Sequence, residues 1–275
     1  MVRDCQLSSM DFIDVARRQL PSEPDIDIVD SVLERTLIAH SRYVPDSRRL
    51  AEWHATFELA LEAIRSADSD DGRITWARTA IGAAATQDDI GRLAELRDNP
   101  AAIGGFAFDQ EMRWEIAVKA VAYGLSGAKL QLDAEAARDR SDRGKRALIR
   151  AGAAQPSAEA KEEAWRRIHG PGYGSFHLTR AAMQGFFWTQ QAELLAPYSG
   201  RFFDEVRSVF ETRDHPFARS YMLTMYPAYR SEQHVLDRSN AVLGSLNGLP
   251  TLSRQLAEMA DELARQIRVR QYAER

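Results

Sequence analysis

The chain has 275 residues, of which 44% are hydrophobic and 28% charged, and 36 Lys and Arg against 40 Asp and Glu give a net charge of -4. This composition is ordinary for a soluble globular protein, and the absence of a basic excess argues against nucleic acid as a partner. No apolar run is long enough to cross a membrane, and charges lie where a signal peptide needs its apolar core. The single cysteine, Cys5, excludes an internal disulfide framework and fits a reducing compartment. We therefore expect a cytoplasmic protein without membrane contact.

Helical periodicity runs along the whole chain. Apolar residues at three- and four-residue spacing form one stripe near the N-terminus, made of Ile26, Val29, Leu33, Leu37 and His40. A second stripe near the C-terminus is made of Leu252, Leu256, Met259, Leu263 and Ile267. Between them, the pattern predicts helices over residues 47–66, 71–84, 87–97, 109–123, 144–153, 157–168, 179–187, 198–210 and 216–225. No stretch shows the period of two that is typical of a β-strand.

Short turn-forming segments separate these helices. Ser157, followed by acidic residues, is expected to cap the N-terminus of a helix, while HGPGYGS (169–175) and NGLPT (247–251) are typical of turns. Amphipathic helices of modest length joined by short turns favour stacked antiparallel pairs. We therefore predict an all-α fold: an irregular α-solenoid, or superhelix, of antiparallel helix pairs similar to HEAT or armadillo arrays. No low-complexity linker interrupts the sequence, so residues 1–275 are expected to form a single helical-repeat domain.

The sequence lacks the motifs of common catalytic chemistries. None of its six histidines forms the pair at four-residue spacing that a zincin helix requires. There is no G-x-S-x-G elbow, and the GPGYG segment lacks the lysine and the preceding strand of a phosphate-binding loop. His169 and His177 flank this segment, and loop or surface positions are favoured over a metal site, although the role of the His169–His177 loop is left open. The chain by itself is not expected to be an enzyme or to hold a cofactor.

Two aromatic segments raise the alternative of a binding surface. Residues 106–124, FAFDQEMRWEIAVKAVAYG, place Asp109 and Arg113 four residues apart, as in a helix-surface ion pair, and Trp114 is expected to pack against a neighbouring helix. The aromatic residues of segment 186–203 could line a peptide groove, but a core between two helices is the favoured interpretation. Both segments are therefore predicted to belong mainly to the scaffold.

Taken in order, six segments resemble the C-terminal helical domain of M1-family zinc aminopeptidases, in particular the aminopeptidase N of actinobacteria. They are DIDIVDSVLERTLIAHSRYV, ITWARTAIGAAAT, GFAFDQEMRWEIAVKAVAYG, AAQPSAEAKEEAW, AAMQGFFWTQQAELLAPYSGRFF and YMLTMYPAY. The resemblance implies a non-catalytic domain of HEAT-like repeats, excised from a larger multi-domain metallopeptidase. The parent would remove N-terminal residues from peptides, with zinc in a catalytic domain outside this chain. This domain would cap the active-site chamber and limit substrate access.

The resemblance also sets the expected partners, which are the catalytic domain of the same polypeptide and peptide substrates. A surface that a neighbouring domain normally covers should cause self-association of the isolated fragment. Residue type and expected exposure give five candidates for peptide contact: Arg113, Trp114, Arg180, Tyr226 and Arg230. The alternative function is a stand-alone helical-repeat scaffold that binds a peptide or protein partner.

Overall fold

A computed structural model describes the backbone of residues 1–275 and every side chain except that of Arg230. Over these described residues it contains fourteen α-helices, five short 3-10 helices and no strand. The predicted all-α fold of repeated helices is therefore confirmed. Contacts group the chain into two compact units, Met1–Ile116 with Gln266–Arg275 (unit 1) and Ala117–Arg265 (unit 2). In a helical array each repeat contacts only its neighbours, so a division into two units does not require a linker between them. The single domain over residues 1–275 stays a prediction.

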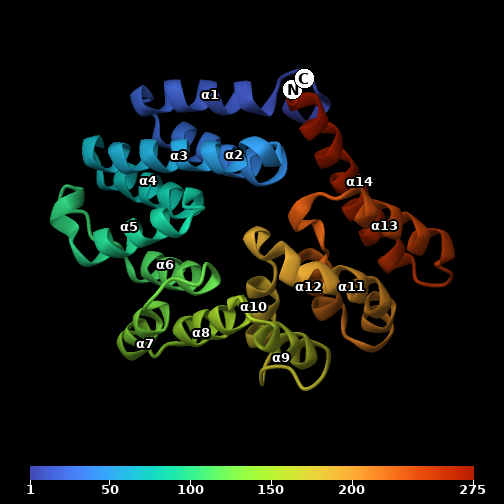
Figure 1. The fold of residues 1–275 in the computed structure, drawn as a ribbon. Helices are drawn as coiled ribbons and strands as arrows, with labels where there is room; N and C mark the ends of the chain where they lie inside the picture. Colours follow the sequence, from blue (N-terminus) through green and yellow to red (C-terminus); the bar gives the residue numbers. More distant parts are fainter. The chain divides into compact units, whose positions relative to one another are not determined.

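Unit 1 is a stack of helices in chain order (Figure 1). Its helices are α1 (Ser9–Gln19), α2 (Ile26–Arg42), α3 (Asp46–Ser66), α4 (Asp70–Ala83), α5 (Gln87–Asp98), the first turns of α6 (Gln110–Ala122) and the end of α14 (Pro250–Ala273), with η1 (Val2–Asp4), η2 (Leu20–Ser22) and η3 (Pro100–Ile103) between them. Helix α2 contacts α1, α3 and α4, and α3 packs closely along α4. The predicted stripe on α2 faces this stack, since Val29, Leu33 and His40 are buried.

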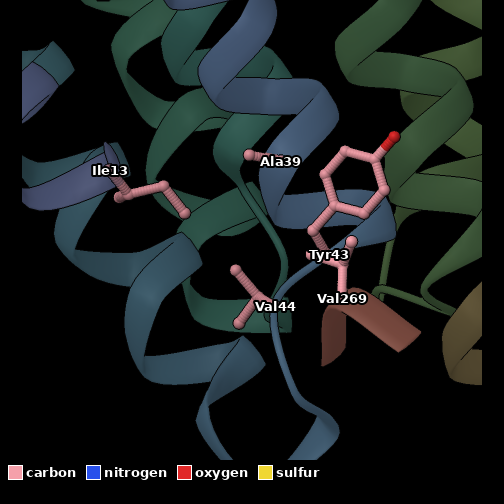
Figure 2. Close-up of a cluster of buried hydrophobic side chains, with 5 residues drawn as sticks. All are labelled: Ile13, Ala39, Tyr43, Val44 and Val269. Carbon is pink, nitrogen blue, oxygen red and sulfur yellow. The ribbon is translucent and has the colours of Figure 1, made fainter. Parts of the chain in front are cut away.

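The C-terminal residues complete the core of unit 1. Figure 2 shows Val269 of α14 in one cluster with Ile13 of α1, Ala39 of α2, and Tyr43 and Val44, which follow α2. Hydrogen bonds fix the same region, because the Arg270 Nε–H donates to the carbonyl of Arg42 over 2.8 Å. Residues more than two hundred positions apart in the sequence are thus joined within one unit.

Unit 2 repeats the helix-pair arrangement. It holds the rest of α6, then α7 (Ala128–Arg138), α8 (Asp142–Ala154), α9 (Ala158–His169), α10 (Phe176–Phe186), η4 (Thr189–Gln191), α11 (Ala192–Thr212), α12 (His215–Met225), η5 (Ala228–Arg230), α13 (Gln233–Ser245) and most of α14. Helices α8, α10 and α12 contact one another in a row, and α9, α11 and α13 form a second row. This alternation is typical of stacked helical repeats.

Local sequence explains where the helices begin. Nine α-helices start after a Ser, Thr or Asp whose side chain accepts a hydrogen bond from a backbone N–H of the first turn, at Ser8, Asp25, Ser69, Thr86, Asp109, Ser141, Ser157, Ser175 and Asp214. Such caps satisfy N–H groups that the helix itself leaves without acceptors. The predicted cap at Ser157 is confirmed, with its Oγ 3.2 Å from the Ala160 nitrogen.

Some elements differ from the prediction. The sequence pattern did not indicate α1, α7 and α13, and α7 and α13 each bury only two of their own residues, so their apolar stripes are too short to detect. Helix α11 begins at Ala192 and continues through Pro197, whereas a start at residue 198 was predicted. Proline usually limits a helix, but here six apolar or aromatic side chains along α11, from Leu195 to Val209, are buried and hold the helix together.

Candidate functional site

Two of the five predicted peptide-contacting residues lie on the unit 1 part of α6. Trp114 is only 3% exposed and belongs to the core. The Arg113 side chain is 13% exposed, and its guanidinium lies 4.0 Å from the carboxylate of Asp98. Asp109 caps the helix, because its Oδ1 accepts a hydrogen bond from the Met112 N–H over 2.8 Å. The segment is thus mainly part of the scaffold, as the sequence predicts.

The other three candidates lie in unit 2. Arg180 is exposed on α10. Tyr226 is buried, and its hydroxyl lies 2.8 Å from the Ser239 Oγ. The side chain of Arg230 lies outside the described residues. Peptide contact by the five residues stays a prediction. Trp114 and Tyr226 are buried in this structure, so each would have to become exposed before it could contact a peptide.

The His169–His177 loop is an ordered connection between α9 and α10. His169 stacks on Trp165, and its Nδ1–H donates to the Trp165 carbonyl over 2.9 Å, while its Nε2 lies 3.0 Å from the Tyr221 hydroxyl. Burial lowers the pKa of His169, so the neutral ring is favoured. His177, by contrast, is exposed. Within the described residues, no three His, Cys, Asp or Glu side chains are arranged to hold a metal ion.

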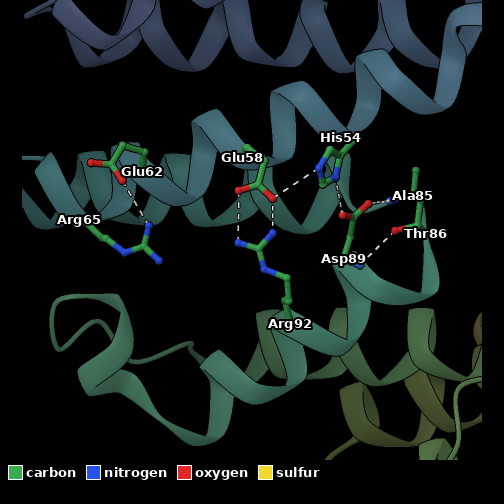
Figure 3. Close-up of polar contacts among 8 residues, drawn as sticks. All are labelled: His54, Glu58, Glu62, Arg65, Ala85, Thr86, Asp89 and Arg92. Carbon is green, nitrogen blue, oxygen red and sulfur yellow. Dashed lines mark hydrogen bonds and ion pairs between the residues drawn. The ribbon is translucent and has the colours of Figure 1, made fainter.

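A polar network joins α3 to α5 in unit 1 (Figure 3). The His54 Nδ1 lies 2.8 Å from the Oδ1 of Asp89, a side chain that is only 1% exposed. The Oδ2 of Asp89 accepts a hydrogen bond from the Ala85 N–H. Next to this pair, Glu58 and Arg92 form a bidentate ion pair, in which the two terminal guanidinium nitrogens donate to the two carboxylate oxygens. The network connects neighbouring helices through side chains from different elements. Only the four-residue spacing of His54 and Glu58 hinted at it in the sequence.

A buried lysine in unit 2 joins the C-terminal ends of two helices. Lys161 of α9 is 0% exposed, and its Nζ donates hydrogen bonds of 2.7 Å to the carbonyls of Ala153 in α8 and Phe186 in α10. Burial lowers the pKa of this ammonium group to about 7. Carbonyls at a helix C-terminus lack partners within the helix and attract positive charge. In the sequence, Lys161 could not be distinguished from a surface lysine among the acidic residues of α9.

A similar contact is made by an amide side chain. The Gln191 Nε2–H donates to the carbonyls of Ala122 in α6 and Ala154 in α8, over 2.7 and 2.8 Å. The C-terminal ends of α6, α8 and α10 within unit 2 are therefore all held by buried donors from other elements, namely Lys161 of α9 and Gln191 of η4.

The side chains of α12 and α14 line an open pocket of about 250 Å³ in unit 2. It is lined from α12 by His215, Arg219, Met222 and Leu223, and from α14 by Arg254, Gln255, Glu258 and Met259. Gln255 is 8% exposed, and its Oε1 has no hydrogen-bond partner among the described residues. The pocket thus combines apolar and charged side chains, whereas the Gln255 Oε1 itself has almost no accessible surface. The sequence analysis placed none of these residues in a site.

Comparison with known proteins identifies the relatives of this chain. The model of the family described as ERAP1-like C-terminal domain matches residues 1–265. Aminopeptidase N of Streptomyces lividans is 31% identical over 269 residues, which cover 98% of this chain and 31% of that relative. The chain therefore spans about a third of the length of this curated relative. Among the described residues, no helix has the length and apolar character needed to cross a membrane.

Proposed function

The chain belongs to the family of ERAP1-like C-terminal domains, and on this basis we propose that it is the non-catalytic C-terminal domain of a longer zinc aminopeptidase. The main support is the coverage of the sequence match, which includes 98% of this chain but only 31% of an aminopeptidase N. The remaining part of the parent would supply the catalytic domain and remove N-terminal residues from peptides.

The zinc is assigned to that catalytic domain. The sequence of this chain has no zincin histidine pair, and its described side chains include no group of three suitable metal ligands. The residues present therefore do not fit a zinc site, and no step of the reaction is assigned to them.

The role proposed for this domain is steric. Stacked helix pairs with buried contacts provide a firm wall, and such a wall could cap an active-site chamber and limit access to short or extended peptides. The expected partners are the catalytic domain of the same polypeptide and peptide substrates, in the cytoplasm. The exposure of Arg180 supports it as one proposed peptide contact.

The size of the native gene product tests this proposal. An antibody against the 275-residue chain should detect, in a lysate of the source organism, a species several times heavier than 30.9 kDa. That species should copurify with zinc and aminopeptidase activity. Detection of a 30.9 kDa product alone would contradict the proposal and favour the stand-alone scaffold.

A truncated parent tests the steric role separately. Removing the segment that corresponds to this chain should shift the ratio of kcat/KM values towards longer peptides, because a barrier to their entry is lost. If the truncated protein is inactive, the ratio of kcat/KM values for long and short peptides cannot be measured. A variant that lacks only Gln233–Ser245 (α13) should therefore be measured as well. Unchanged length preference in an active deletion variant would refute the capping role.

A further inference from the structure

The turn between α13 and α14 carries an Asn-Gly pair in open surroundings. It lies within the NGLPT segment that the sequence predicts as a turn, and Figure 1 labels the two helices that it joins. Asn247 and Gly248 are both exposed. Gly248 has a φ of 82°, and a Cβ built on it would meet no described atom within 4 Å. The Asn247 side chain can therefore approach the Gly248 nitrogen from an open side.

Neither of these two groups is held by a hydrogen bond. Within the described part of the chain, the Asn247 side chain and the Gly248 N–H both lack a hydrogen-bond partner. A hydrogen bond of 3.3 Å from the Leu246 N–H to the Leu243 carbonyl closes α13 directly before the pair. The side chain of Asn247 is thus free to rotate, and the backbone N–H of Gly248 is accessible to water.

The other asparagines of the chain lack this combination. Asn99 precedes a proline, whose nitrogen carries no hydrogen and cannot act as a nucleophile. Asn240 is exposed, but it lies inside α13, where the next backbone N–H belongs to the hydrogen bonds of the helix. In the Asp-Gly pair of α4, Asp71 and Gly72, the glycine N–H donates to the Ser69 Oγ over 3.1 Å. The α13–α14 turn is therefore the place where sequence and backbone together favour a reaction.

We propose that Asn247 is a site of spontaneous deamidation. Asparagine is chemically labile, and a glycine on its C-terminal side leaves the attacking nitrogen with little steric hindrance. The Gly248 nitrogen forms a bond to the Asn247 Cγ, and the bond from Cγ to Nδ2 breaks. The amide proton leaves with the Nδ2 group as ammonia, and a succinimide remains.

Water, the only co-reactant, then opens the succinimide at either of its two carbonyls. Attack at Cγ breaks the bond from Cγ to the Gly248 nitrogen and gives aspartate in the normal main chain. Attack at the main-chain carbonyl breaks the original peptide bond and gives isoaspartate, in which the main chain runs through Cγ. Neither route changes the oxidation state of any atom.

The products alter the turn in two ways. Either one adds a negative charge to a chain whose net charge is already -4. Isoaspartate also lengthens the main chain between the helices by one methylene group. Helix α13 buries only Val235 and Ser239, whereas Leu252 and Leu256 of α14 are 0% exposed. The inserted carbon should therefore displace the end of α13 and leave α14 packed.

Ageing of the 275-residue chain in a mildly alkaline buffer, followed by tryptic digestion and mass spectrometry, tests the site. Cleavage after Arg238 and Arg254 gives one peptide that contains both Asn240 and Asn247. Replacement of NH2 by OH should accumulate at Asn247 at least about tenfold faster than at Asn240. Protein L-isoaspartyl methyltransferase with a labelled methyl donor should then modify the aged chain and not the fresh chain.

Substitutions test the assignment to this pair. Asn247→Gln should remove the signal, because a glutamine side chain would have to close a larger ring. Asn240→Gln is the matched control, since Asn240 is also exposed, and it should leave the rate at Asn247 unchanged. Gly248→Ala should slow the reaction about tenfold, because its methyl group hinders the attacking nitrogen. An alanine is strained at a φ of 82°, so far-UV circular dichroism should accompany this variant, and Asn247→Gln tests the site without that strain.

Three results would overturn the inference. These are deamidation of Asn247 no faster than that of Asn240, persistence of the methyltransferase signal in Asn247→Gln, and a rate in the folded chain more than about tenfold below that in a synthetic peptide of residues 239–254. The last result would mean that the folded turn holds the pair away from the reactive geometry. The experiment involves no peptidase activity, so its outcome is independent of the proposed aminopeptidase function.

Discussion

Replacing Lys161 by methionine should change how the stability of the chain depends on pH. In the wild type, the buried amine has its pKa lowered from 10.5 to about 7, and burial is the cause. Between these two values the unfolded chain binds a proton at this site and the folded chain does not. Since the unfolded state binds more protons, the free energy of unfolding rises with pH across this window.

The magnitude follows from the pKa difference. The shift of Lys161 from 10.5 to about 7 corresponds to about 5 kcal/mol in total, and each pH unit inside the window contributes at most about 1.4 kcal/mol. Between pH 6 and pH 9, the site should therefore add about 3 kcal/mol to the stability of the wild type. Helix C-termini favour the charged form and act against the shift, so this figure is an upper value.

The methionine variant lacks the titrating group and loses both hydrogen bonds to Ala153 and Phe186. Each carbonyl left without a donor costs about 1–3 kcal/mol, a term that does not vary with pH. At pH 9 the variant should be clearly less stable than the wild type. Near pH 6 the difference should shrink, because the wild type there bears the cost of a buried charge.

Urea unfolding followed by far-UV circular dichroism, at several pH values from 6 to 9, measures these stabilities. The control is Lys145→Met, since Lys145 is an exposed lysine on α8 whose ammonium lies 3.1 Å from Asp142. Its difference from the wild type should stay small and independent of pH. If the difference between the wild type and the Lys161 variant is also independent of pH, Lys161 does not titrate in this window, and the reasoning is refuted.

Three further predictions concern other parts of the chain. Burial and the charge of Arg17 lower the pKa of His40 to about 3, so at this site only the unfolded state gains a proton as the pH falls from 6.5 towards 3. The free energy of unfolding should therefore fall over this range, and His40→Gln should reduce that pH dependence in urea titrations. A Cβ at Gly185 would lie 2.2 Å from the carbonyl of Arg150, so Gly185→Ala should destabilise the α8–α10 contact by about 1–3 kcal/mol in thermal unfolding, whereas Gly152→Ala, which meets no atom within 4 Å, should not. The isolated chain should self-associate with rising concentration in sedimentation velocity experiments, and a strict monomer at all concentrations would argue against a large covered surface.

The fold was predictable because its main signals are local. Apolar residues at helical spacing identified most helices within a few residues, as at α3 and α5, and Ser157 was recognised as the cap of α9. Helices α7 and α13 escaped because they bury few side chains and therefore leave little periodic signal. Pro197 misled the prediction of α11, because burial of neighbouring apolar residues outweighed the local effect of a proline.

The candidate sites depend on contacts between distant elements, and sequence spacing does not encode these. Arg219 and Gln255 face the same pocket from different helices, and nothing in their local segments marks them. Lys161 is likewise defined by carbonyls on two other helices. Residue type was also misleading about exposure, since Trp114 and Tyr226 were chosen as surface aromatics and are buried.

The position of Val269 and Arg270 in the core of unit 1 has a consequence for biosynthesis. Residues 1–116 leave the ribosome before residues 117–275, yet the cluster around Ile13 and Tyr43 lacks Val269 until nearly all of these residues have been translated. Closing a loop of this length is entropically costly and slow compared with local helix packing. Unit 1 therefore stays incomplete until residues 266–275 have been translated, and the apolar surface next to Tyr43 is accessible to chaperones until then.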